Sequence, residues 1–150
     1  MRKTFSSSST SLRDMVVSMP AAKSTLVRTA LIAGLADAIL ILVFAAIGRD
    51  AHQRADVLTG VFSTAWPFLA GAAIGWLAAR VWRAPFRTWP AGVAVWIGAV
   101  AGGMLLRAAT GQTVVIAFII VALISLAILL LGYRAVVGLV VRVRRRTRQS

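Results

Sequence analysis

A single carboxylate interrupts the first long apolar segment of the chain. Asp37 lies near the middle of the stretch LIAGLADAILILVFAAIGRD. An isolated aspartate at the centre of a membrane-spanning helix costs about 2.5–3.5 kcal/mol, so such a residue faces protein or water. Three interpretations are open at this stage. Asp37 is paired with a cation inside a bundle, or it is protonated and donates a hydrogen bond to a carbonyl such as that of Ser63, or it titrates and binds a proton or a cationic ligand.

Arg107 is the cation that the sequence offers most directly as a partner for Asp37. It follows the apolar stretch GMLL and lies about one helical turn from the end of an apolar segment. Its long side chain can extend outward to water or turn inward towards the acid. We therefore predict a candidate intramembrane polar site made of Asp37 and Arg107, whose first role is to hold helices together.

A second polar cluster, made of Arg49, Asp50 and His52, follows the first apolar segment. His52 is the only histidine and the chain has no cysteine, so the usual zinc ligand sets cannot be assembled. We interpret the cluster as a solvated outer loop in which Arg49 and His52 form a small basic rim. No phosphate-binding loop, serine-nucleophile motif or metalloprotease motif is present. The sequence predicts no catalytic, cofactor-binding or metal-binding residues and no enzyme activity.

The composition places these residues in a membrane protein. Of the 150 residues 59% are hydrophobic and only 14% are charged, whereas a soluble domain has about 25% charged residues. A membrane-spanning helix needs about 20 apolar residues, and irregular backbone is not tolerated in lipid. We therefore predict an all-α protein, an integral membrane four-helix antiparallel bundle. Its predicted parts are a disordered tail at 1–22, a bundle at 23–141 with spans at about 29–48, 57–79, 91–109 and 114–133, and a basic tail at 142–150.

The distribution of positive charge predicts the orientation of the bundle. Fourteen of the 17 Lys and Arg residues fall in the two ends of the chain and the loop between the second and third spans. By the positive-inside rule both termini lie in the cytoplasm, and the protein is a multi-pass protein of the cell membrane. The net charge of +13 favours contact with the lipid bilayer and with anionic lipids at the basic cytoplasmic ends. Since no nucleic-acid-binding fold signature is present, we predict no nucleic-acid partner.

Small residues indicate how the spans pack. Gly71 and Gly75 form a GxxxG motif in the second span, and Gly98 and Gly102 form another in the third, where Gly103 lies on a parallel row with Arg107. Such motifs let helix backbones approach closely. We favour packing within the chain over dimerisation, and a homo-oligomer or a larger membrane complex remains open. Pro67 lies in the middle of the second span and predicts a kink, with a hinge as the alternative.

The stretches VFAAIGRDAH, TAWPFLAGAAIGW and GMLLR resemble a family of small four-span membrane proteins of high-GC Gram-positive bacteria, known as domain of unknown function 3054. The resemblance covers about residues 31–134 and implies the four-span architecture without an activity. The absence of catalytic motifs favours a non-enzymatic structural or accessory membrane protein, or a subunit of a larger membrane complex. The alternative is a small proton-coupled transporter that uses Asp37.

Overall fold

The chain folds into helices and their connections. The computed structural model describes the backbone of residues 12–50 and 57–148, and the side chains of residues 24–48 and 58–148. The elements are α1 (Leu12–Asp50), α2 (Val57–Ala78), the short 3-10 helix η1 (Val81–Arg83), a third helical segment and α5 (Ile116–Thr147). The third segment is built from η2 (Thr88–Gly92), α3 (Val93–Ile97), η3 (Gly98–Gly102) and α4 (Gly103–Ala109), where η2 and η3 are π-helical turns.

Four of these helical segments are long and apolar enough to cross a membrane, which confirms the predicted number of spans. The segments are Ser24–Gly48, Leu58–Ala78, Thr88–Ala109 and Ile116–Thr147. Their apolar side chains face outward as well as inward, and Leu77, Leu105 and Ile116 are each more than 60% exposed. This distribution is expected when lipid rather than water surrounds a helix bundle.

Two predicted boundaries differ from the structure. Helix α1 begins at Leu12, inside the segment 1–22 for which we predict a disordered tail, and residues 1–11 lie outside the described part of the chain. Helix α5 continues to Thr147, through most of the predicted basic tail at 142–150. Both differences have the same physical reason, because extending an existing helix is much less costly than nucleating a new one.

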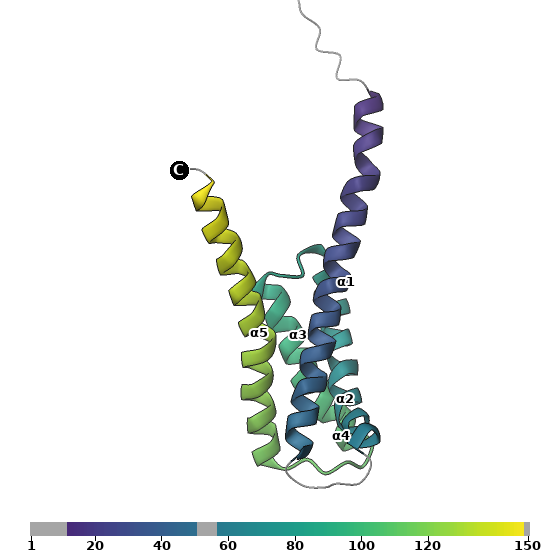
Figure 1. Ribbon diagram of the computed structural model, residues 1–150. Helices are drawn as coiled ribbons and strands as arrows, with labels where there is room; N and C mark the ends of the chain where they lie inside the picture. Colours follow the sequence, from purple (N-terminus) through teal and green to yellow (C-terminus); the bar gives the residue numbers. More distant parts are fainter. Residues whose placement is uncertain (1–11, 51–56, 149–150) are drawn as a thin grey trace, which may run out of the picture.

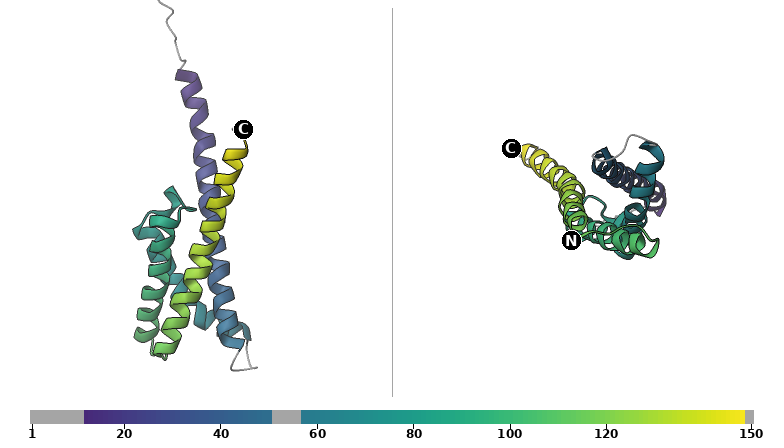
Figure 2. Two further views of the ribbon diagram at one scale, coloured as in Figure 1. Left: turned by 90° about the vertical axis from the view of Figure 1, so that its left-hand side faces the viewer. Right: turned by 90° about the horizontal axis from the view of Figure 1, so that it is seen from below.

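The connections alternate between the two ends of the bundle. Figure 1 shows that the connection between α2 and the third segment lies at the end from which α1 and α5 extend, and that the connection between α4 and α5 lies at the opposite end. Figure 2 shows that α1 and α5 both continue beyond the shorter helices at the first end. The arginines of the connection that follows α2 and those of the last turns of α5 therefore lie at the same end of the molecule.

Helix α2 packs against the third segment through glycines. A Cβ atom on Gly71 would meet the carbonyl oxygen of Gly98 and would lie 2.8 Å from the backbone N of Gly103. A Cβ atom on Gly75 would meet the carbonyl oxygen of Ala94. The structure thus places the glycine motifs of both segments at a contact within the chain, where only glycine lets the two backbones come so close.

Pro67 and Phe68 anchor the same helix in the core. Both side chains are fully buried, and α2 continues as one helix from Val57 to Ala78 with Pro67 inside it. The ring of Phe68 packs edge-on against that of Phe44, with 5.4 Å between their centroids, and near Phe118 at 6.1 Å. The position of Pro67 in a close-packed core favours a fixed local geometry over a hinge.

Candidate polar site

Asp37 lies inside the bundle and is 2% exposed. Its Oδ1 accepts hydrogen bonds from the Tyr133 hydroxyl at 2.9 Å and from Arg134 Nη1 at 2.8 Å. Its Oδ2 accepts hydrogen bonds from Trp76 Nε1 at 2.8 Å and from Arg134 Nη2 at 2.7 Å. A carboxylate has about four lone-pair sites, so the protein fills the entire accepting capacity of this acid with donors from α2 and α5.

Arg134 is the counter-ion of Asp37. The two side chains form a bidentate ion pair, and the arginine side chain has no exposed surface. Two of its three other N–H donors are also used, because Nε donates to the carbonyl of Pro85 at 3.0 Å and Nη1 donates to the carbonyl of Leu130 at 2.9 Å. One guanidinium group therefore ties together α1, α5 and the connection that follows α2.

Local sequence makes room for this arginine. Gly92 lies in the third segment beside Arg134, and a Cβ atom at that position would lie 2.8 Å from the arginine Cδ. On the other side, Gly34 of α1 faces Trp76, with the added Cβ at an ordinary contact distance of 3.8 Å from the ring. Gly92 therefore lets the large side chain of Arg134 reach the acid, whereas the position of Gly34 would also accept an alanine.

The expected pair of Asp37 and Arg107 is wrong, because the acid is paired with Arg134. Arg107 instead lies over the ring of Phe118, with its Cζ 4.8 Å from the ring centroid, and Nη2 donates a long hydrogen bond of 3.4 Å to the carbonyl of Thr113. Its Nε and Nη1 are buried without a hydrogen-bond partner among the described residues. The physical reason is depth, because Arg107 is close to the end of its helix whereas Arg134 is level with Asp37.

From the sequence, Arg134 is counted only among the basic residues of the C-terminal end, and no site role is predicted for Tyr133. A signal for their true role exists in the sequence. Arg134 is followed by the stretch AVVGLVV before the next arginine, Arg142, so it lies inside a long apolar run as Asp37 does. Two opposite charges that each interrupt an apolar run are natural partners.

The remaining predicted site residues fall into two groups. Arg49, Asp50 and His52 of the outer-loop cluster fall outside the part of the chain whose side chains the structure describes. The five predicted packing glycines, Gly71, Gly75, Gly98, Gly102 and Gly103, form the helix contact described above. Of the candidate residues whose side chains the structure describes, Asp37 alone therefore belongs to the polar network.

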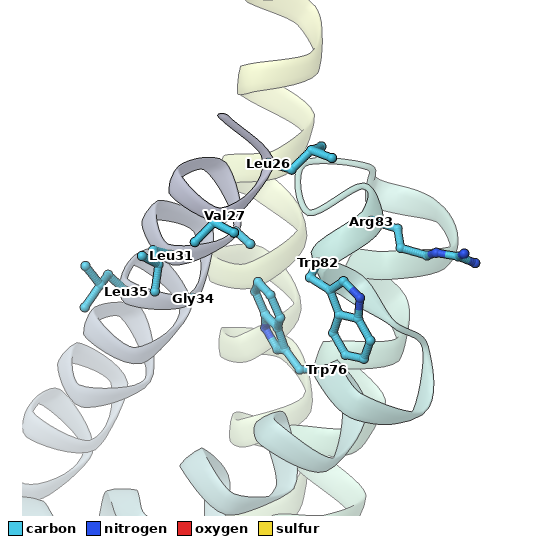
Figure 3. Close-up of a pocket in the computed structure, with 9 residues that line it drawn as sticks. Leu26, Val27, Leu31, Gly34, Leu35, Trp76, Trp82 and Arg83 are labelled. Atoms are coloured by element: carbon cyan, nitrogen blue, oxygen red, sulfur yellow. The ribbon is translucent and has the colours of Figure 1, made fainter. Parts of the chain in front are cut away.

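An apolar cavity borders the network on the side of α1 and α2. Asp37 and Trp76 help to line a space of about 390 Å³. It adjoins a space of about 780 Å³, since Gly34, Trp76 and Trp82 line both. Figure 3 shows Trp76 and Trp82 in the wall of the larger cavity, facing residues of α1, with the Arg83 side chain directed away from them. The wall beside Asp37 is therefore aromatic and aliphatic.

Trp76→Phe and Tyr133→Phe should each lower the free energy of unfolding in detergent by about 0.6–1.7 kcal/mol, the range of single interhelical polar contacts in membranes. Each substitution removes one of the four hydrogen bonds to Asp37. Tyr133→Phe keeps the ring, whereas Trp76→Phe also replaces the indole with a smaller phenyl ring. Trp66→Phe is the matched control, because Trp66 is on the same helix and no hydrogen bond of its indole is found in the described structure. An equal loss of stability in the control would show that the bonds to Asp37 contribute nothing specific.

Comparisons with known proteins agree with the resemblance noted in the sequence. No curated protein and no solved structure matches the chain. One family model matches residues 34–137, which is more than half of the chain. The matched range includes Asp37 and Arg134, and hence the complete polar network. The chain belongs to the family described as Protein of unknown function (DUF3054).

Proposed function

We propose that this chain is a non-enzymatic structural or accessory protein of the cell membrane, acting as a subunit of a larger membrane complex. In this proposal the four spans form an antiparallel bundle with both termini in the cytoplasm. The connection that follows α2 and the last turns of α5 lie at one end of the bundle, and the excess of basic residues at that end supports this orientation.

The main support for a structural role is that donors from the protein occupy the hydrogen-bond-accepting positions of the Asp37 carboxylate. Four hydrogen bonds from α2 and α5 converge on a carboxylate of α1. Breaking a buried ion pair by removing one partner is strongly destabilising. An acid held in this way therefore fixes the relative positions of three helices.

The proposed topology predicts that a reporter protein that is active only in the cytoplasm will be active when it is fused to either terminus. A fusion at Gln53 should show the opposite behaviour, because residue 53 follows the first span. A periplasmic or extracellular C-terminus would contradict the proposed orientation.

The accessory role is tested by purification of the tagged full chain from its own membrane in mild detergent, followed by blue native electrophoresis. We expect migration as a complex of defined stoichiometry, and a fall in the abundance of the partner when the chain is deleted. Recovery of the chain alone, together with unchanged levels of all other membrane proteins in the deletion strain, would contradict the proposal.

A second candidate function is proton-coupled transport, and one observation favours it. Asp37 and Trp76 line a cavity of about 390 Å³, so a ligand in that space would touch the polar network. The test is proton flux into vesicles that contain the purified chain, with Asp37→Asn as the variant. If the parent chain conducts protons and the Asp37→Asn variant does not, transport rather than the accessory role is the function.

A further inference from the structure

A separate cavity of about 650 Å³ lies between the connection that follows α2 and the last turns of α5. This volume is within the range of about 300–1,000 Å³ that is usual for small-molecule sites. Its wall combines two arginines, from different elements, with aromatic and aliphatic side chains. The residues that matter for the argument are Phe86, Arg87, Trp89, Gly138, Leu139 and Arg142.

The two arginines lack a counter-charge within the described protein. The sequence contains four acidic residues, and none of them follows Asp56. Asp37 is already saturated by the network around Arg134. The guanidinium groups of Arg87 and Arg142 form no hydrogen bond or ion pair with the side chains described, those of residues 24–48 and 58–148. Among the described side chains Asp37 is the only carboxylate and it is already paired, so this pair of charges favours an anion that lies outside the described part of the protein.

The wall of the cavity changes from apolar to cationic along α5. Ala135, Gly138, Leu139 and Arg142 follow one another at helical spacing and lie on one face of the helix. A Cβ atom on Gly138 would meet nothing within 4 Å, so this glycine leaves space at the wall. Trp89 is 72% exposed beside the same cavity, and exposed tryptophan rings are enriched at membrane–water interfaces.

We propose that this cavity binds one anionic phospholipid of the cytoplasmic leaflet. The phosphate lies between Arg87 and Arg142, and the glycerol and the first part of an acyl chain lie along Phe86 and Leu139. The site takes an anionic rather than a zwitterionic lipid, because the ammonium of a zwitterionic headgroup would face two guanidinium groups and no carboxylate. The assignment to the cytoplasmic leaflet rests on the orientation proposed above.

The test measures binding of phosphatidylglycerol and phosphatidylcholine to the full chain in neutral detergent by native mass spectrometry. We expect one phosphatidylglycerol to be retained per chain, in preference to phosphatidylcholine. Arg87→Gln and Arg142→Gln should each weaken its binding about fivefold, and the double variant about 25-fold. The control double variant, Arg144→Gln with Arg148→Gln, removes the same charge from exposed positions that do not line the cavity. It should weaken binding less than about twofold, because neither side chain lines the cavity and salt screens charges at a distance from the bound phosphate.

Two further measurements separate a lipid site from a general anion site. Gly138→Leu fills the cavity without changing the charge and should also weaken the binding of phosphatidylglycerol. An excess of inorganic phosphate should leave the lipid bound, because it lacks the apolar contacts. Equal losses in both double variants, no effect of Gly138→Leu, or displacement by phosphate would each overturn the proposal. Lipid binding is measured on the purified chain in detergent, whereas the proposed function is tested by the topology and partner experiments. Failure of one proposal can therefore be distinguished from failure of the other.

Discussion

Arg134→Met is expected to lower the free energy of unfolding in detergent by about 3–5 kcal/mol, the usual cost of removing one partner from a buried ion pair. Methionine keeps an unbranched side chain of similar length, so the main loss is charge and hydrogen bonding. The substitution leaves the Asp37 carboxylate, which is 2% exposed, with only Trp76 and Tyr133 as donors. It also frees the carbonyls of Pro85 and Leu130.

A double-mutant cycle isolates the contribution of the pair itself. Asp37→Asn should also destabilise the protein, because it leaves Arg134 as an uncompensated buried cation. The double variant should be more stable than the sum of the two single losses predicts, with a coupling of at least about 1 kcal/mol. The same cycle between Asp37 and Arg107 is the control and should give a coupling near zero, since Arg107 lies over Phe118. A coupling with Arg107 as large as that with Arg134 would contradict the assignment of the ion pair.

Substitution of the packing glycines should produce the second large effect. Gly71→Ala and Gly75→Ala each place a Cβ atom against backbone atoms of the third segment, in positions that real Cβ atoms do not occupy. Backbone cannot move aside as a flexible side chain can, so we expect a loss of about 1–3 kcal/mol for each variant, the cost of overpacking. Leucine at the same positions should prevent the two helices from packing at all. Thermal unfolding in detergent measures both effects.

Gly132→Ala is the matched control for these variants. Gly132 is in the membrane-spanning part of α5, and an added Cβ atom would meet nothing within 4 Å. Since alanine is favoured over glycine in a helix by about 1 kcal/mol, this variant should keep or raise the melting temperature. If Gly132→Ala lost as much stability as Gly71→Ala and Gly75→Ala, the losses at the two packing positions could not be assigned to the helix contact.

The spans and their packing motifs could be predicted because they depend on local sequence. A run of about 20 apolar residues has few alternatives to a membrane helix, and each of the four predicted spans falls on a described helix. The spacing of Gly71 and Gly75 marked a smooth helix face, and the spacing of Gly98 and Gly102 marked a second one. The interior position of Asp37 also followed from its type and depth, because an acid that faced lipid would be too costly.

The identity of the partner of Asp37 could not be predicted in the same way. Several arginines are close to apolar segments, and the choice among them depends on the rotation and depth of each helix. Arg134 reaches the acid because α5 continues to Thr147 without a break, which keeps residue 134 well inside the helix. The space that Gly92 leaves for its side chain is supplied by a different segment. These conditions involve residues far apart in the chain.

The sequence by itself determined the class of protein, the number of spans, the glycine faces and the need to shield Asp37, since each follows from hydropathy or from spacing within one helix. Only the tertiary structure decided that Arg134, Tyr133 and Trp76 shield the acid, while Arg107 lies over an aromatic ring. It also brought Arg87 and Arg142 to one cavity. The physical reason is that charge pairing requires side chains to meet at the same depth and on facing sides of two helices, and that geometry is set by the packing of the whole bundle.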